Sequence, residues 1–216
     1  KNASDTNASS VPLVTNRDNF DGQQAQLTTD THNFIAKYPG TLGNSLRVSF
    51  SGQGDTDYAN WAYKSYYDAA PGTSDFATAA GATNDEAHVA IIDEDGAISG
   101  IPGTVLETFD YLSQGSDAKG IDGTSNYYVD VINARSQYVR WLAAPTGLTD
   151  AGDAISATST FTTVTAPIEN SLTAGTDDNT PTAAEVVTGL QMFLDSETVD
   201  VNLLFAFPGS NSGVGE

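Results

Sequence analysis

The chain has 216 residues, of which 28 are acidic and 8 basic, so its formal net charge at pH 7 is −20. A charge of this size repels phosphate backbones and anionic lipids, which argues against a nucleic-acid or membrane partner. The absence of cysteine excludes disulfides and thiolate chemistry. Hydrophobic residues make up 39% of the chain, which is enough for one domain with a core plus irregular insertions.

The N-terminal part of the chain changes from polar to patterned. Residues 1–33 are rich in Asn, Ser, Thr, Gln and Asp, which predicts a polar entry segment or linker. A corner with two turn signals follows, made by Pro39-Gly40 and Gly43-Asn44, where glycine permits positive φ. Residues 46–50 then alternate between apolar and polar, which predicts a half-buried strand launched from this corner.

Residues 52–82 form a predicted insertion with an aromatic window. Trp61, Tyr63, Tyr66 and Tyr67 lie close together there. One interpretation is an aromatic plug that packs the insertion onto the domain. The other is a stacking platform for sugars or for a neighbouring subunit.

A hairpin is predicted next. The β-branched run 89–92 is closed by Asp93-Glu94-Asp95-Gly96, and a second strand covers residues 105–112. The acidic stretch lacks the ligand spacing and the distal Glu of a calcium loop, so we interpret it as a turn.

A short helix and a third strand complete this central region. Thr124 or Ser125 is expected to cap a helix in which Tyr128, Val131 and Ile132 fall at helical spacing. The third strand that follows is expected to end with the residues Tyr138-Val-Arg-Trp141.

The C-terminal part begins with a second polar insertion, residues 144–178. Within it, 158–165 can form an exposed strand anchored by Phe161, and 168–174 can form another. A helix is predicted to start at Thr180-Pro181 or at Thr182, which has Glu185 three residues on. Its expected apolar face comprises Val186, Leu190, Phe193 and Leu194.

A last strand, 199–205, is predicted to precede a flexible tail at 210–216. Because helices alternate with strands, the predicted fold is α/β (α+β), with a mixed β-sheet packed against a few helices over residues 34–209.

The sequence shows no signature of an enzyme or of a cofactor site. His32 and His88 are the only histidines, and they lack the spacing of a zinc site. Nucleophile-elbow, phosphate-loop and dinucleotide motifs are also missing from the sequence. We therefore expect no catalytic residue, no metal and no cofactor. A hydrolase using two carboxylates from distant positions stays open as an alternative, because sequence alone does not reveal such a pair.

Three ordered blocks resemble the central domain of contractile bacteriophage tail sheath proteins. The first is AKYPGTLGNSLRVSF, which begins at Ala36. The second reads DEAHVAIIDEDGAI, TVLETFDYLS, GTSNYY and VINARSQYVRW in order. The third, TPTAAEVVTGLQMFLDSETVDVNLLFAFPG, begins at Thr180. The scaffold positions that carry the resemblance are Pro39, Gly40, Gly43, Asn44, Ser125, Asn126, Val199, Val201, Leu203 and Phe205.

The resemblance implies a structural subunit of a myovirus tail sheath, from a large phage. Such subunits polymerise around the inner tube and contract to drive it through the host envelope during DNA injection. The implied partners are other sheath subunits, the inner tail tube and the baseplate; the implied location is the virion, after assembly in the host cytoplasm.

Because the chain begins at Lys1 rather than Met, we interpret it as part of a longer protein. We expect this part to be monomeric on its own. The alternative function is a virion-surface or extracellular carbohydrate-binding module that uses the aromatic window.

Overall fold

The computed structural model describes residues 1–5, 11–29, 32–52, 58–144, 148–161, 166–195, 197 and 200. The chain forms two compact units, Lys1–Asp177 and Asp178–Glu216. Of the four α-helices in the described residues, the first unit holds three together with the sheet, and the second holds the fourth.

Seven strands form one sheet in the order β5-β4-β3-β7-β1-β2-β6. Their bounds are β1 Ser4–Asp5, β2 Phe34–Ala36, β3 Leu46–Gly52, β4 Glu86–Asp93, β5 Thr104–Ser113, β6 Val139–Trp141 and β7 Ile168–Thr173. The ladders between these strands are antiparallel. Within the described residues, parallel pairing occurs only as isolated bridges, Thr83 with Thr160 and Ser113 with Tyr127. The predicted α/β class, a sheet packed against a few helices, is confirmed, but the sheet expected to be mixed has antiparallel ladders.

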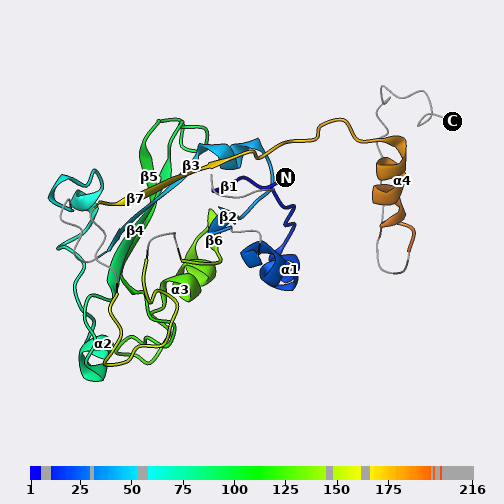
Figure 1. Ribbon diagram of the computed structural model, residues 1–216. Coiled ribbons are helices and arrows are strands. Elements are labelled where there is room, and N and C mark those ends of the chain that lie inside the picture. Colours follow the sequence, from blue (N-terminus) through cyan, green and yellow to red (C-terminus); the bar gives the residue numbers. More distant parts are fainter. Residues whose placement is uncertain are drawn as a thin grey trace. The chain divides into compact units, whose positions relative to one another are not determined.

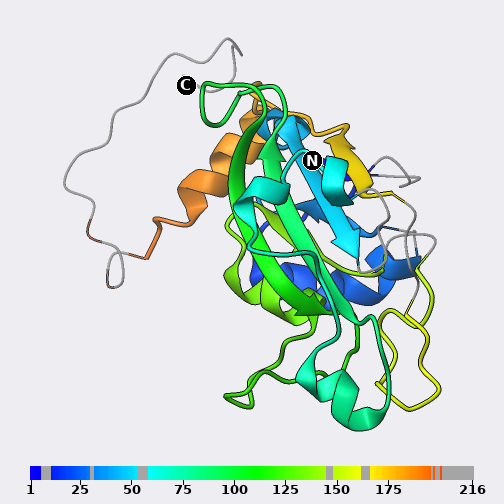
Figure 2. The same cartoon turned by 90° about the vertical axis from the view of Figure 1, so that its left-hand side faces the viewer.

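The helices are α1 Arg17–Thr29, α2 Asp75–Ala80, α3 Tyr128–Arg135 and α4 Ala183–Gln191, with 3-10 turns at Thr41–Ser45, Tyr58–Asn60 and Lys64–Tyr66. In unit 1, α1 and α3 lie on one side of the sheet, and the 3-10 turns at 58–66 lie on the other (Figures 1 and 2). None of the helices in the described part of the chain has the length and apolar character needed to cross a membrane.

The main core lies between the sheet and α3. Alternate residues of β3 and β4 point into it, and three rings form its centre. Tyr128 and Trp141 contact edge-to-face with centroids 5.2 Å apart, and Phe50 lies 6.1 Å and 6.3 Å from them. Each buried ring of this size stabilises the fold by roughly 1.5–3 kcal/mol relative to an exposed one.

Of the two alternatives predicted for segment 1–33, entry segment or linker, the described residues contradict the linker, because they belong to the sheet and to a packed helix. Strand β1 pairs with β7 on one side and β2 on the other, so it lies inside the sheet. Helix α1 packs Phe20 and Leu27 into a second apolar cluster. Polar composition hid this role because the partners of buried Asn2 come from other segments: its side-chain amide donates to the Ala36 carbonyl and accepts from the Val14 N–H.

The expected start of the third helix is also displaced. Helix α3 begins at Tyr128, and its N-cap is Tyr127 without a side-chain cap bond. The Ser125 hydroxyl instead donates to Asp130 at 2.8 Å and accepts from the Tyr127 N–H at 3.3 Å. Asn126 is fixed by donating to the Tyr111 carbonyl, so the N-cap lies three residues after Thr124 and two after Ser125, the two caps that the sequence predicts.

The second polar insertion, 144–178, contains a central strand. The prediction of a strand over 168–174 is confirmed, but β7 lies between β3 and β1 rather than in a decoration. Phe161 is buried, as expected of an anchor, although only Thr160 of its neighbourhood makes a bridge and 162–165 lie outside the described residues.

The predicted helix start at Thr182 is confirmed by a capping box with Glu185 in α4. Apart from residue 200, the predicted strand 199–205 and the tail at 210–216 lie outside the described residues.

Candidate functional site: the outer face of the sheet

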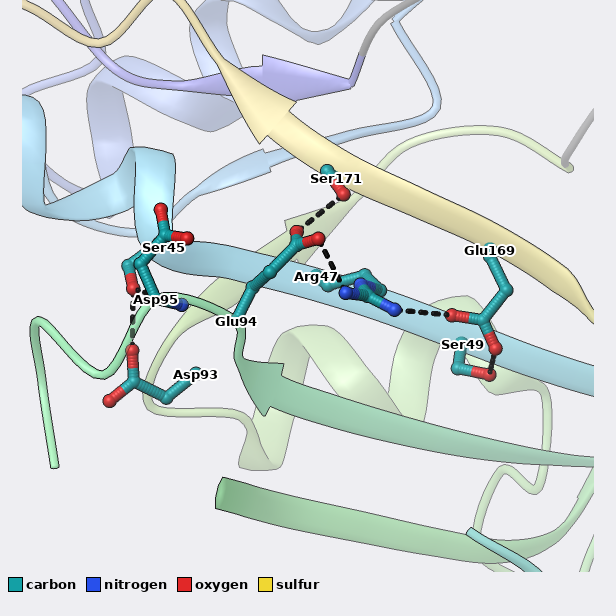
Figure 3. Close-up of polar contacts among 8 residues, drawn as sticks. All are labelled: Ser45, Arg47, Ser49, Asp93, Glu94, Asp95, Glu169 and Ser171. Carbon is teal, nitrogen blue, oxygen red and sulfur yellow. Dashed lines mark hydrogen bonds and ion pairs between the residues drawn. The ribbon is translucent and has the colours of Figure 1, made fainter. Parts of the chain in front are cut away.

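A charged network occupies the face of β3 and β7 opposite the main core. Arg47 lies between two carboxylates, Glu94 at the end of β4 and Glu169 on β7 (Figure 3). Its guanidinium donates to Glu94 Oε1, and its Nη1 lies 3.5 Å from Glu169 Oε2. Ser171 donates to Glu94 at 2.5 Å, and Ser49 donates to Glu169 at 2.6 Å. The network therefore joins three strands.

The electrostatics of this network favour ionised carboxylates. Burial alone would raise the pKa of Glu94, but hydrogen bonds from Arg47 and Ser171 outweigh burial and lower it. Hydrogen bonding to Glu94 raises the pKa of Arg47 against the opposing effect of burial. A general acid needs a raised pKa, so Glu94 is suited to holding strands together rather than to donating a proton.

The acidic turn after β4 contains a second carboxylate held by hydrogen bonds, that of Asp93. This arrangement supports the turn interpretation of residues 93–96. Asp93 is buried and accepts from the Ser45 hydroxyl at 2.6 Å. It also accepts from the Ile98 N–H at 3.0 Å and from both the N–H and the hydroxyl of Ser99. Burial raises the pKa of Asp93, but these donors more than offset burial and bring it to about 2.

We expect Asp93→Asn to destabilise the protein by about 2 kcal/mol at pH 7, because an amide turns an N–H₂ group toward these donors. The pKa of Asp93 is lower in the folded protein than in the unfolded chain. The ionised carboxylate therefore contributes to the free energy of unfolding above pH ~3.8, and this contribution is lost as the pH falls to about 2. The stability deficit of Asp93→Asn should therefore shrink by about 2 kcal/mol across that range, measured by urea unfolding at several pH values.

Asp95→Asn, on an exposed neighbour, is the control and should change stability by less than ~0.5 kcal/mol. A deficit that stays constant with pH would contradict the assignment.

The aromatic window packs against the same face. Trp61 and Tyr67 are 4% and 9% exposed, whereas Tyr66 is 58% exposed. Trp61 Nε1 donates to the Ser49 hydroxyl at 2.8 Å, which links the rings to the charged network. The Tyr67 hydroxyl donates to the Val89 carbonyl at 2.8 Å. This geometry supports the plug interpretation, because a sugar platform needs ring faces open to solvent.

His88 connects this aromatic layer to β4 and β5. Its ring stacks on Tyr67 with centroids 4.3 Å apart and meets Tyr111 edge-to-face at 4.7 Å. Burial lowers the pKa of His88, against smaller raising effects from the Ala69 carbonyl and Asp110. His88 is therefore a buried residue that packs between strands and insertion. The described residues contain no group of three or more acidic, His or Cys side chains placed to hold a metal ion.

The corner residues form a tight packing point rather than a ligand site. Gly40 has a positive φ of 126° and Gly43 lies against Ala3 and Ala36, where an added Cβ would be within 2.9 Å of both. Asn44 exchanges two hydrogen bonds with the backbone of Gly175, and Pro39 is exposed. Val199, Val201, Leu203 and Phe205, the remaining scaffold positions, lie outside the described residues.

Two further motif residues, Asn133 and Ser136, lock α3 to β6. The Asn133 side chain accepts from the Trp141 N–H and donates to the Trp141 carbonyl, both at 2.7 Å. The Ser136 hydroxyl donates to Glu107 on β5 and accepts from the Val139 N–H. We name this group of side chains, Asn133, Ser136 and Glu107, the α3 lock. It occupies the outer edge of β6 and thus satisfies backbone groups that an edge strand would expose.

The sequence reasoning missed the charged network. Glu169 and Ser171 lie outside the blocks that carry the resemblance, and 122 residues separate Arg47 from Glu169. The one local signal was the alternation in β3, which puts Arg47 and Ser49 on the face opposite Val48. A hollow of about 400 Å³ between β5 and α3 includes Asp110 and Asp130 in its lining.

No protein-family model matches the chain, and a search of curated proteins found no significant match.

Proposed function

We propose that this chain is a structural subunit of a contractile phage tail sheath and acts as a rigid block in a helical lattice. By the resemblance, its partners are other sheath subunits, the inner tube and the baseplate. Subunits of such a lattice keep their shape while their interfaces rearrange. The requirement on the chain is therefore stiffness of the domain, not a reactive centre.

The observation that carries the proposal is that side chains of the resembling blocks make hydrogen bonds between distant segments. Asn133, Ser136 and Glu107 of the resembling blocks bond helix α3 to both β5 and β6. Asn44 of the corner bonds to the backbone at Gly175, 131 residues away. These side chains cross-link distant strands, which is the role that a rigid lattice subunit requires of them.

The polar groups of the outer face support the same conclusion. Arg47, Glu94 and Glu169 neutralise one another in part and tie β3, β4 and β7 together. Trp61 of the aromatic window donates to Ser49, which in turn donates to Glu169. Each of these groups has its partners within the domain, so the arrangement favours a structural role.

Immunogold labelling tests the proposal directly. Antibodies raised against residues 1–177 should decorate tails of the encoding phage along the whole sheath, in both extended and contracted particles. A protein extracted from purified tails and identified by peptide mass should contain this sequence in many copies per particle. Label confined to fibres or capsid, or no label on the tail, would refute the proposal, provided that an antibody to the tube protein labels the same preparation.

A further inference from the structure

The side chain of His88 is completely enclosed between the sheet and the aromatic insertion. The residue has no exposed surface, and its ring lies between Tyr67 of the insertion and Tyr111 of β5. Tyr58 lies farther out, with its centroid 6.2 Å from the imidazole. The position lies at an irregularity where the β4–β5 register shifts between Ala87 and Val89.

Both ring nitrogens of His88 make hydrogen bonds, one with a backbone donor and the other with a backbone acceptor. Nδ1 accepts the backbone N–H of Tyr111 at 3.1 Å, which requires Nδ1 to carry no proton. Nε2 lies 2.8 Å from the Ala69 carbonyl, which can only accept, so Nε2 carries the proton. The contacts thus hold the neutral ring in one tautomer. An imidazolium has an N–H at both positions and would set one donor against the Tyr111 N–H.

The described residues around the ring include few groups that could stabilise a positive charge. Among the described residues, Asp110 on β5 is the carboxylate whose charge favours the protonated ring. The insertion contributes Tyr58 and Tyr67, which are neutral, and β3 contributes Ser51, which pairs with His88 across the ladder. Burial opposes the charge more strongly than Asp110 supports it.

The two layers around His88 differ in how firmly they are held. β4 and β5 pair from Glu86–Ser113 to Asp93–Thr104, so the Tyr111 side is part of a long ladder. The insertion is held to the sheet through rings and a few single bonds, among them Trp61 to Ser49 and Tyr67 to Val89. A charged ring would therefore displace the insertion before it displaced the ladder.

We propose that residues 58–69 form an acid-sensitive cover: protonation of His88 releases these residues from the outer face of β4 and exposes the apolar patch around Ala90 and Ile92. The sheet and α3 stay folded in the released state. The device goes beyond the proposed function and holds whether or not the chain assembles.

Hydrogen exchange of the wild-type protein tests the cover. A solvated histidine has a pKa of about 6.5, so the population of the released state should grow about tenfold between pH 7.5 and 5.5. Protection factors, which correct for the pH dependence of intrinsic exchange, should fall about tenfold in peptides covering 58–69. Peptides covering β5 should keep theirs. Equal loss in both regions, or no loss in either, would overturn the proposal.

Variants assign the response to one ring. His88→Gln keeps a donor that can reach the Ala69 carbonyl and cannot be protonated, so its protection at 58–69 should change less than twofold. His32→Gln alters the other buried histidine and should keep the tenfold response. A tenfold response in His88→Gln would overturn the proposal.

The wild-type imidazole ¹⁵N spectrum covers the case in which His88→Gln does not fold. It should show the Nε2–H tautomer of His88 at pH 7.5 and protonation in step with the loss of protection. Protonation without loss of protection would also overturn the proposal.

Discussion

Gly175→Ala is expected to destabilise unit 1 by about 3 kcal/mol, more than any exposed substitution in the domain. Gly175 lies two residues after β7, where the chain passes the corner. A Cβ added there would lie 2.3 Å from the backbone carbonyl oxygen of Gly40 and 3.2 Å from Ala3 Cβ. The Gly40 carbonyl has little freedom to move away, because the Gly40 N–H is bonded to the Lys1 carbonyl and the Thr41 N–H to Asp177. Alanine would therefore push the chain off Asn44 and break two hydrogen bonds.

Gly22→Ala is the matched control for this substitution. Gly22 lies within α1, has no heavy atom within 4 Å of a built Cβ, and does not have a positive φ. Alanine is favoured over glycine in a helix by about 1 kcal/mol, so this variant should be more stable than the parent. Urea unfolding followed by far-UV circular dichroism measures both variants at pH 7. Equal stability of the two variants would show that the corner yields to an extra methyl group, and the close approach would then not be a constraint.

Where the signal was local, the sequence was sufficient. Strand β3 is predicted by the alternation in residues 46–50, and β4 by the β-branched run 89–92. The acidic turn predicts the connection from β4 to β5. These strands are neighbours in the chain or carry clear period-two patterns, so their existence follows from the residues themselves. The capping box at Thr182 is equally local, and it forms as predicted.

The remaining features depend on partners far away in the sequence. Segment 1–33 reads as polar, yet β1 pairs with β7, whose residues Leu172 and Thr173 lie opposite Asp5 and Ser4. A two-residue strand has no periodicity to detect, and its burial depends on strands on both sides. Polar side chains such as Asn2 are tolerated inside because the fold supplies their partners.

The candidate site was hidden for the same reason. The β3–β7 register places Ser49 opposite Glu169 and Arg47 opposite Ser171, and this register brings the charges together. Sequence alone fixes neither which strands pair nor their register when more than 100 residues lie between them. The aromatic window was visible, but its packing role depended on finding Ser49 and Val89 beneath it.

The α3 lock is more than a set of helix contacts, because it replaces a missing strand. Strand β6 has β2 on one side, and on the other side the Asn133 amide bonds to the N–H and the carbonyl of Trp141 as a neighbouring strand would. Ser136 does the same for the N–H of Val139. Trp141 is fully buried, so these backbone groups have no access to solvent as a substitute.

Asn133→Ala is therefore expected to cost about 3 kcal/mol, because it leaves a buried donor and a buried acceptor without partners at about 1–3 kcal/mol each. Chemical denaturation with tryptophan fluorescence reports the loss, since Trp141 lies at the site. Arg135→Ala, two residues along the same helix and exposed, is the control; its guanidinium lies 5.9 Å from the Phe109 ring, and its removal should cost less than ~1 kcal/mol. If the lock is what holds α3, hydrogen exchange in Asn133→Ala should accelerate at residues 139–141 and in α3, while β3 and β4 keep their protection. Similar losses in the two variants would instead mean that packing of Tyr128 and Ile132 holds the helix without the lock.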